Sequence, residues 1–463
     1  MLKWGGDAEG GAPFVEADPS DLTKMRGFDV ELAVMIAEGL GSTPEFVQVA
    51  WASIAASVER GDFEIGLSGV EDRPALRERY ALSLPYYEFG EVLAVRPADR
   101  ERFRSLADLA GRRVGTLGST LAYQMLLDEQ KRSGLVPVSY ENDVHPYSDL
   151  VSGRIDAVLL DDIISERSLR RTGGFVIQPE PVATAHYVVM LARADTARRD
   201  SVNAIIRARM ADGSLERVFR DWNVWKPTQA EHFARVLGDV PTASVAATGT
   251  GMTSLRSYLP ALLRAAGITL VLSCLAMALA VGLGVLVAAG RVYGGRITRG
   301  LLMAYVEVMR GTPVLLQLFV IYYGLAGVVR LPAFAAAVIG LGLNYAAYEA
   351  EIYRGALEAV PRAQLEAGRT LGFSELQILR LIRGPQALRF ALAPMTNDFV
   401  ALLKDSSLVS VITVVELTKQ TSIYATNIGS WLVPGILCGV VYLTMSLPLS
   451  HFARRLERRW SVA

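Results

Sequence analysis

Residues 362–387 read RAQLEAGRTLGFSELQILRLIRGPQA, and the interpretation of the whole chain starts from this stretch. It is polar and rich in arginine, yet it lies between segments apolar enough to cross a membrane. Glu366 and Ala367 precede Gly372, and an amphipathic run follows the glycine. Two charged helices joined by a glycine between two membrane spans are typical of a cytoplasmic loop on which a partner docks.

The composition separates the chain into a soluble part and a membrane part. With 463 residues, more than one domain is expected, and the hydrophobic residues (51% of the chain) concentrate after residue 255. The formal net charge of zero gives no support to nucleic-acid binding. The only two cysteines, Cys274 and Cys438, lie in apolar runs. They are expected to pack in a core, because two cysteines make neither a disulfide framework nor a metal cluster.

Residues 256–463 are predicted to form an all-α transmembrane bundle of about five helices, because apolar runs of near-spanning length recur there. The predicted spans are 265–290, 311–329, 331–348, 390–403 and 431–449. Arginines concentrate after the first, third and last of these spans. The excess of positive charge on cytoplasmic loops then places residues 354–387 and the C-terminus in the cytoplasm and the N-terminal half outside.

Residues 1–225 are expected to form a soluble α/β region, because short apolar runs alternate with helical patterns. Parallel sheets built this way bind ligands at the carboxyl ends of their strands. Residues 226–255 are predicted to be a linker, since 242–254 (TASVAATGTGMTS) is small and polar without an apolar period. Such a tether would hold the soluble domain close to its own membrane domain.

The soluble half resembles the type-II periplasmic binding proteins for polar amino acids over nearly all of its length. The resemblance rests on GFDVEL (27–32), GDFE (61–64), LSLPYY (82–87), LADL (106–109), VG (114–115) and GRIDAV (153–158). It implies an extracytoplasmic domain with one lobe of 1–94 and 188–225 and a second of 95–187. It also implies hinge strands near 92–96 and 187–191.

The second half resembles the amino-acid permeases of ABC importers. The motifs are YVEVMRGTP (305–313), the loop 362–387, which is similar to the family's EAA loop, and KDSSLVSVI (404–412). The resemblance implies that Glu366, Ala367 and Gly372 belong to a loop, 354–387, that couples the membrane helices to an ABC ATPase. The family usually has alanine where Gly368 stands, and glycine costs helix stability, so a looser docking helix is predicted.

An amino-acid ligand needs a cation and backbone donors for its carboxylate. Arg77 is the best candidate by its spacing from Ser83, with Arg73 in reserve, and the alternative is an arginine solvated at a helix start. Ser68 and Gly69, at a strand end, are expected to offer a hydroxyl and backbone groups.

Three further ligand contacts are predicted from the second lobe and the N-terminal loop. Thr120 opens a predicted helix, where free N–H groups favour an anion. Asp161 follows an apolar strand and matches the family's ammonium-binding acid, although it could instead cap the next helix, as could Asp162. Phe14 resembles the family's ligand-stacking aromatic, with core packing as the alternative, and Trp51 is a weaker candidate.

The sequence lacks several signatures. It has no G-x-x-x-x-G-K-[ST] phosphate loop, so a separate ATPase must supply energy, and one docking loop per chain implies a pair of chains, expected to be a homodimer. The four histidines show no metal-binding spacing, and no catalytic constellation, metal site or cofactor site is predicted. The prediction is therefore a multi-pass inner-membrane subunit of an ABC importer for polar amino acids, not an enzyme. The alternatives are a ligand-gated sensor or channel, a dehydratase on the same fold, and an importer of another small organic anion.

Overall fold

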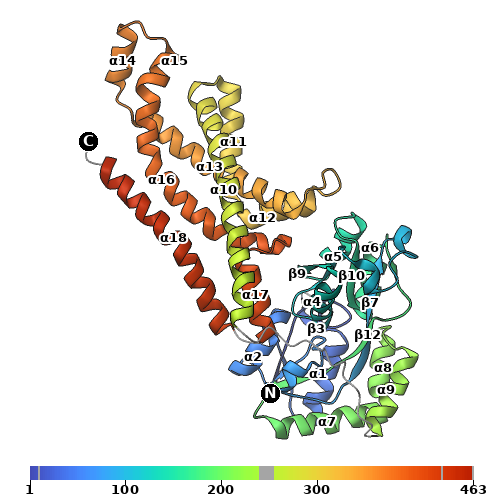
Figure 1. The fold of residues 1–463 in the computed structure, drawn as a ribbon. Helices are drawn as coiled ribbons and strands as arrows, with labels where there is room; N and C mark the ends of the chain where they lie inside the picture. The colour runs from blue at the N-terminus through green and yellow to red at the C-terminus, as the bar shows by residue number, and fades with distance from the viewer. Residues whose placement is uncertain (9–10, 239–254, 429–430, 461–463) are drawn as a thin grey trace. The chain divides into compact units, whose positions relative to one another are not determined.

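The computed structural model describes residues 1–8, 11–238, 255–428 and 431–460. These residues form two compact units that divide near residue 254. The first contains α-helices and β-sheets, and the second contains helices (Figure 1).

The first sheet of the α/β unit has the strand order β4-β1-β5-β13-β6. β1 is parallel to both of its neighbours, whereas β13 is antiparallel to β5 and β6. The strands are β1 (Leu2–Gly6), β4 (Pro44–Gln48), β5 (Ile65–Gly66), β6 (Tyr80–Leu82) and β13 (Met190–Ala192), with the separate hairpin β2 (Glu16–Asp18) and β3 (Asp21–Arg26). The helices of this part of the chain are α1 (Phe28–Gly39), α2 (Ile54–Arg60), α3 (Pro74–Arg77), α7 (Thr196–Ala211) and α8 (Ser214–Asp221). α1 packs through Phe28, Leu32 and Ile36, which the helical repeat brings to one buried face.

The second sheet has the order β11-β7-β10-β8-β9, with β12 also paired to β7. β8 is parallel to β9 and β10, and β7 runs antiparallel to β10. The strands are β7 (Tyr87–Val95), β8 (Arg113–Leu117), β9 (Val136–Tyr140), β10 (Ala157–Asp161), β11 (Val176–Ile177) and β12 (Ala183–Tyr187). The helices are α4 (Leu121–Ser133), α5 (Val144–Val151) and α6 (Asp162–Thr172).

The chain passes between the two sheets twice, through 83–86 after β6 and through 188–189 after β12. Backbone hydrogen bonds join the two passages: Ser83 N–H donates to Val189 O at 2.9 Å, and Tyr86 N–H donates to Tyr187 O at 3.0 Å. The second crossing lies where the sequence placed it. The first was expected near 92–96, but β7 pairs along its length within the second sheet, so the boundary comes before residue 87 rather than at 94.

The structure also differs from the predicted linker. Pro227–Leu237 forms α9, which buries Gln229, His232 and Phe233 against the α/β unit. The side chain of Gln229 exchanges hydrogen bonds with the backbone of Glu88 on β7. The predicted tether therefore begins later than 226, and its residues 239–254 lie outside the described residues.

The helical unit contains long helices and a short two-helix excursion. Its elements are α10 (Leu255–Tyr293), α11 (Arg296–Gly311), α12 (Val314–Phe319) with the π-helix η4 (Val320–Gly324), α13 (Ala333–Ala359), α14 (Arg362–Thr370), α15 (Glu375–Ile378) with the π-helix η5 (Leu379–Arg383), α16 (Gly384–Asp405), the 3₁₀ helix η6 (Ser406–Ile412), α17 (Leu417–Ile428) and α18 (Leu432–Trp460). α10 packs closely on α13, where a Cβ on Gly342 would lie 2.6 Å from Leu279. The approach of the two helices therefore requires glycine at this position.

Two helices among the described residues are long and apolar enough to cross a membrane, Tyr258–Tyr293 and Leu432–Phe452. Arg296–Gly311 and Val314–Gly324 together would make a third, but they are bent by 107°. The span predicted over 311–329 is therefore interrupted near its start, because α11 ends at Gly311 and the chain turns before α12 begins after Pro313. The predicted spans 331–348 and 390–403 fall on α13 and α16, so the count of five is not confirmed.

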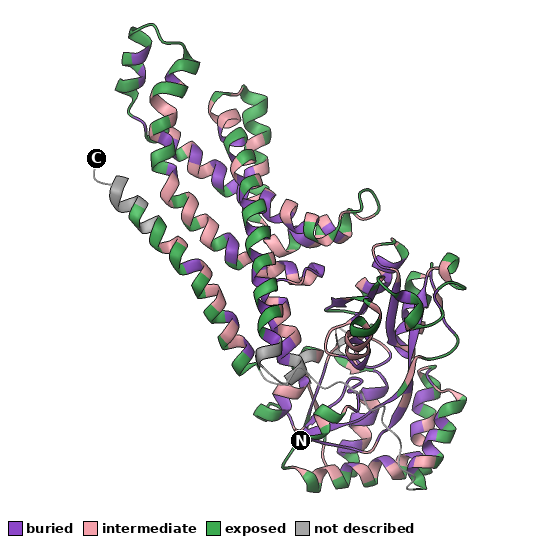
Figure 2. Cartoon of the chain, in the orientation of Figure 1, coloured by how far each residue is buried: buried purple, intermediate pink, exposed green. Residues whose placement is uncertain are grey.

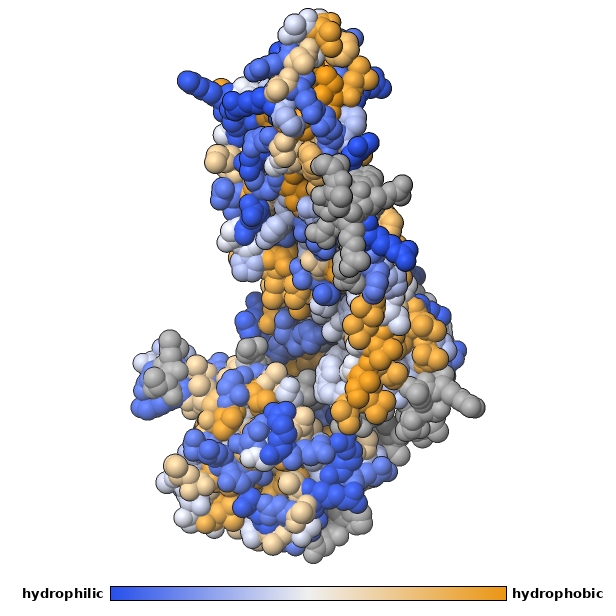
Figure 3. Space-filling model, turned by 90° about the vertical axis from the view of Figure 1, so that its left-hand side faces the viewer, coloured by the Kyte–Doolittle hydropathy of each residue, from blue (hydrophilic) through white to orange (hydrophobic). Residues whose placement is uncertain are grey.

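Exposure differs sharply between the two units. The strands of the α/β unit are largely buried, whereas α10 and α18 are exposed over long stretches (Figure 2). Many of the exposed residues of the helical unit are hydrophobic, and Figure 3 shows hydrophobic residues gathered in patches on the molecular surface. On α18 the exposed hydrophobic residues recur every three or four positions: Leu432, Ile436, Val440, Leu443 and Leu447. This spacing makes one continuous apolar stripe along the helix.

Candidate functional site

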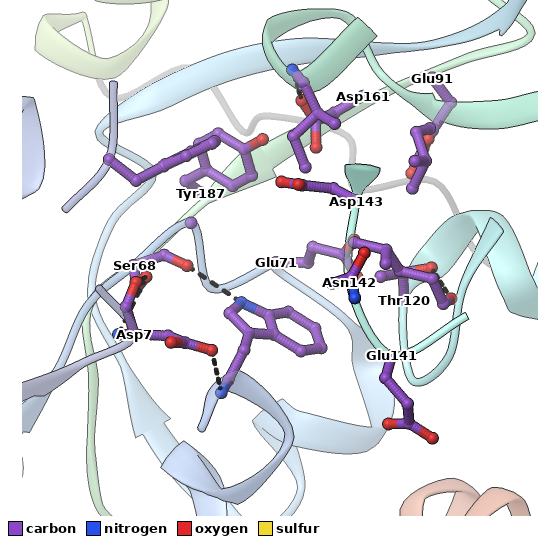
Figure 4. Close-up of a pocket in the computed structure, with 16 residues that line it drawn as sticks. Asp7, Ser68, Glu71, Glu91, Thr120, Glu141, Asn142, Asp143, Asp161 and Tyr187 are labelled. Carbon is purple, nitrogen blue, oxygen red and sulfur yellow. Dashed lines mark hydrogen bonds between the residues drawn. The ribbon is translucent and has the colours of Figure 1, made fainter. Parts of the chain in front are cut away.

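A pocket in the α/β unit is lined by residues from both sheets and their loops (Figure 4). Its lining is unusually acidic. The lining residues are Asp7, Phe14, Trp51, Ser68, Gly69, Glu71, Glu91, Leu117, Thr120, Glu141, Asn142, Asp143, Leu160, Asp161, Ile164 and Tyr187.

The topology explains why these residues meet. Thr120 follows β8, Asp143 follows β9, and Asp161 ends β10, and these three strands run parallel. Their carboxyl ends therefore lie at one edge of the second sheet. Ser68 and Gly69 follow β5 of the first sheet, so the pocket lies beside the two passages between the sheets.

Five of the six predicted ligand contacts line this pocket: Phe14, Ser68, Gly69, Thr120 and Asp161. Trp51 lines it too, and its indole N–H donates to Ser68 O at 3.0 Å. Phe14 also packs on Phe28, with ring centroids 5.1 Å apart. It therefore belongs to the core as well as to the pocket wall.

Arg77 is not among the lining residues. Its guanidinium pairs with the buried carboxylate of Asp72, and 46% of its side chain is exposed. Arg73, the reserve candidate, lies nearer the pocket, with Nε 3.6 Å from Glu71 Oε2. Arg77 thus pairs with an acid of the chain itself in this structure, and its expected carboxylate-binding role stays a prediction.

Ser68 and Gly69 do not offer their backbone donors to the pocket. Both N–H groups donate to Asp29 Oδ2, at 3.0 and 2.8 Å, and Tyr86 O–H donates to Asp29 Oδ1 at 2.7 Å. Burial raises the pKa of Asp29 to about 7, against these stabilising hydrogen bonds. Asp29 therefore holds the end of β5 in place, and the expected ligand contacts of Ser68 and Gly69 stay predictions.

The N-terminus of α4 is occupied as well. Leu121 N–H donates to Glu71 Oε2 at 2.7 Å, and Ala122 N–H donates to Glu91. Tyr123 N–H donates to Thr120 Oγ1 at 3.2 Å. The first turn of this helix was expected to be open to a ligand anion, but two carboxylates and a hydroxyl of the chain already cap it.

Asp161 combines a capping role with a place in the pocket. Its Oδ1 accepts a hydrogen bond of 2.7 Å from Ile164 N–H, so it is the N-cap of α6. Its neighbour Asp162 instead pairs with Lys226 and accepts from Gly90 N–H. Burial raises the pKa of Asp161 to about 7. The hydrogen bond from Ile164 N–H opposes this rise, and the neighbouring charge of Asp162 adds to it.

Sequence reasoning did not find the other acids of the pocket. Asp7 follows β1, and Glu141 and Asp143 follow β9, so their places at strand ends were a usable signal. Glu91 lies in the middle of β7 and Glu71 follows β5, and neither position stands out in the sequence. Burial raises the pKa of Glu71 to about 7, and burial together with Glu71, Asp161 and Asp162 raises that of Glu91 well above its usual range.

A second polar cluster lies where α9 meets the sheet. One ligand atom from each of Glu88, His186 and His232 lies within 4.8 Å of the others, an arrangement that the sequence spacing did not reveal. His186 Nε2 is 3.3 Å from Glu88 Oε2, and His232 Nε2 is 3.1 Å from Pro85 O. Arg235 of α9 pairs with the same Glu88 carboxylate. The cluster is thus a polar network, with an ion pair between Arg235 and Glu88, that fixes α9 on β7 and β12.

In the helical unit, the predicted coupling residues lie on the excursion formed by α14 and α15. Glu366 and Ala367 are exposed on α14, and Gly372 turns the chain with φ +81°, a value that favours glycine. α14 and α15 lie at the opposite end of the helical unit from α17 (Figure 1). Leu371 and Leu376 are 75% and 71% exposed, so this surface joins apolar and acidic groups.

Gly368 has a packing role that the sequence did not indicate. A Cβ at this position would lie 2.8 Å from Ile382 and 3.2 Å from Ile378. The glycine therefore lets α14 approach the following segment closely. The prediction that Gly368 loosens the helix finds no support in this contact.

Comparison with known proteins agrees with the division of the chain into an α/β unit and a helical unit. Residues 3–224 match the family described as bacterial extracellular solute-binding proteins, family 3, and residues 280–462 match the family described as binding-protein-dependent transport system inner membrane component. The glutamine transport system permease protein GlnP of Escherichia coli (strain K12) is 38% identical over 208 residues, covering 44% of this chain and 94% of GlnP. The histidine/lysine/arginine/ornithine permease protein HisQ of the same strain is 32% identical, covering 43% of this chain and 93% of HisQ.

Among solved structures, an ancestral arginine-binding protein bound to arginine is 25% identical, with a TM-score of 0.44, covering 48% of this chain and 97% of that one. The sequence matches define a chain that joins a solute-binding domain to an ABC-importer permease domain. The chain belongs to the family of binding-protein-dependent transport system inner membrane components. It is a multi-pass inner-membrane protein with its own binding domain.

Proposed function

We propose that this chain is the receptor and permease subunit of an ABC importer for polar amino acids. The observation that carries the proposal is the presence, in one chain, of a solute-binding domain with a pocket and a permease domain whose excursion α14–α15 exposes Glu366 and Leu371. The amino-acid class is supported by relatives such as GlnP and HisQ, which are permeases for amino acids.

In this proposal the α/β unit lies outside the cytoplasm and captures the solute. The exposed apolar stripe of α18 faces lipid, because such a stripe would be costly in water. The arginine-rich excursion of α14 and α15 lies inside, in keeping with the positive-inside rule. Two copies of the chain form the translocation path, and the chain acts as a transporter and not as an enzyme.

The energy comes from a separate ABC ATPase that binds the surface around Glu366 and Leu371. Ligand closes the two lobes over the pocket, and ATP-driven closure of the ATPase moves α14 and the helices joined to it. A ligand-gated channel would not need this docking surface, so the channel alternative is not favoured. The acidic pocket lining also argues against an organic anion as the solute.

The test is ligand-stimulated ATP hydrolysis by the chain reconstituted with its ATPase. Glu366→Lys should abolish the stimulation and leave ligand affinity unchanged. Glu231→Lys is the matched control, because it makes the same charge change at an exposed position of α9. Stimulation that survives in Glu366→Lys would refute the assigned docking site.

A further inference from the structure

Two of the four histidines of the chain meet at one glutamate. Glu88 of β7 and His186 of β12 are directly opposite each other in an antiparallel pair, so their side chains share one face of the sheet. α9 packs on β7 and brings His232 to the same point. None of these three is among the described residues that line the pocket, so the cluster is separate from the solute site.

The contacts of His232 fix which of its two nitrogens is free. Nε2 lies 3.1 Å from Pro85 O, and a carbonyl oxygen only accepts, so Nε2 carries the proton. Nδ1 therefore keeps its lone pair, and it is buried without a hydrogen-bond partner among the described residues. It lies 3.9 Å from Glu88 Oε2, too far for a hydrogen bond. An imidazole whose other nitrogen donates to a backbone carbonyl is the arrangement found at metal sites.

The spacing of the cluster is close to that of ligands around a tetrahedral ion. Two ligand atoms at about 2.1 Å from zinc are about 3.4 Å apart. Glu88 Oε2 lies 3.3 Å from His186 Nε2 and 3.9 Å from His232 Nδ1. The two imidazole centres are 5.1 Å apart, and two imidazoles on one tetrahedral zinc would have centres about 5 Å apart. Small side-chain rotations would therefore bring all three ligands onto one ion.

Arg235 now takes the place of such an ion. Its guanidinium pairs with the Glu88 carboxylate, and 40% of its side chain is exposed. His186 and His232, in contrast, are 4% and 0% exposed. A long side chain that reaches solvent can turn outward, and this movement would open Glu88 to an ion and leave one coordination position for water.

We propose that Glu88, His186 and His232 form a binding site for a divalent transition-metal ion of the zinc class. The ion would replace Arg235 as the counter-charge of Glu88 and join α9 to β7 and β12. Neutral imidazoles and a carboxylate are ligands that zinc prefers, whereas magnesium and calcium favour sites made of oxygen atoms. The site goes beyond the proposed import function and does not depend on which solute the chain carries.

The experiment is isothermal titration of zinc chloride into the full-length chain in lipid nanodiscs, purified without a polyhistidine tag and stripped of metal by a chelator. His186→Gln and His232→Gln should each weaken zinc binding about a hundredfold or more, since loss of a residue that only orients a ligand already costs ten- to hundredfold. His145→Gln is the matched control, because His145 of α5 lies outside the cluster, and it should leave the affinity unchanged. Titration with cobalt, whose visible absorption reports four-coordinate geometry, should give the spectrum of a tetrahedral site.

Arg235→Gln gives a change of the opposite sign. It keeps all three ligands and removes the competing guanidinium, so zinc should bind about fivefold more tightly, the upper end expected for a partly exposed ion pair. In the unmutated chain, zinc should slow amide exchange in α9 and leave α4 unchanged, because only α9 carries a ligand. The thermal transition without zinc shows which variants are folded. Where a histidine variant is not folded, Arg235→Gln and the cobalt spectrum decide.

Each result bears on the site itself. Zinc affinity that survives both His186→Gln and His232→Gln would place the ion elsewhere on the chain and overturn the site. Weaker binding in Arg235→Gln would overturn the exchange of the arginine for the ion. Absence of zinc binding in the folded, unmutated chain would overturn the proposal, whether or not Arg235→Gln binds the ion.

Discussion

Affinity for a basic amino acid such as arginine, one of the polar amino acids of the proposed function, should rise as the pH is raised from 6 to 8, because acids line the pocket. The pKa values of Asp161 and Glu71 lie at about 7 in the empty pocket, so at pH 6 both groups hold protons. A bound cation favours the ionised carboxylates and lowers these pKa values, and the protons must leave. For one group with a pKa of 7 that falls well below 6 on binding, affinity changes by about tenfold over this range. Two such groups give about a hundredfold.

The neighbours of these groups do not reverse the sign. Asp162 and Glu71 raise the pKa of Asp161, and Arg167 lowers it less than burial raises it. Arg73 likewise only partly offsets the burial of Glu71. Arginine is a suitable probe because its own charge is unchanged between pH 6 and 8.

The assay is titration calorimetry at several pH values, repeated at each pH in two buffers of different ionisation enthalpy to count the protons released. At pH 6 between one and two protons should be released, and at pH 8 almost none. Asp161→Asn should remove about one tenfold step of the pH dependence. An affinity that is flat or falls from pH 6 to 8 would refute the electrostatic reasoning.

Three further predictions follow from single contacts. Burial lowers the pKa of His232 to about 4, so the folded state favours the neutral ring. The free energy of unfolding should therefore fall as the pH drops from 6.5 toward 4, by about 2 kcal/mol between pH 7 and 5. A His232→Gln variant should lose this pH dependence in thermal melts. Asp29→Ala leaves the N–H groups of Ser68 and Gly69 and one tyrosine hydroxyl without their acceptor and should cost about 3 kcal/mol or more in denaturant unfolding, whereas a cost below about 1 kcal/mol would contradict its holding role. Gly372→Ala places a side chain at φ +81° and should destabilise the coupling loop by about 1 kcal/mol, measured as faster amide exchange in α14 with ligand affinity unchanged.

The sequence was most informative where position along the chain decides position in space. In an α/β sheet, a residue that follows a strand lies at the sheet edge, and so Thr120 and Asp161 were placed at a pocket without coordinates. Their roles toward a ligand remain predictions. The two family resemblances likewise located the solute-binding and permease segments that the comparisons confirm.

The sequence was least informative about which polar groups are already paired. Arg77 carries the expected charge, but its guanidinium forms an ion pair with Asp72, five residues away. Glu71 reaches α4 across fifty positions in the chain, a contact that exists only after the sheets are assembled. Whether a donor is free for a ligand is a tertiary property, and spacing alone does not reveal it.

Two misses had a signal in the sequence. The buried residues of α9 recur at helical spacing: Gln229, His232, Phe233 and Val236. This spacing predicts a helix with a packed face, within the stretch that the composition predicts to be a linker. Pro313 stands at the point where the assigned second span bends, and proline rarely continues a helix.

The most direct test of the account is solute uptake into proteoliposomes that contain the full-length chain and its ATPase. Radiolabelled arginine is supplied outside and ATP inside. The account predicts uptake that requires both ATP and the ATPase, is abolished by Glu366→Lys and persists in Glu231→Lys. Uptake without the ATPase, or uptake that survives Glu366→Lys, would contradict the claim that the exposed loop couples ATP hydrolysis to import.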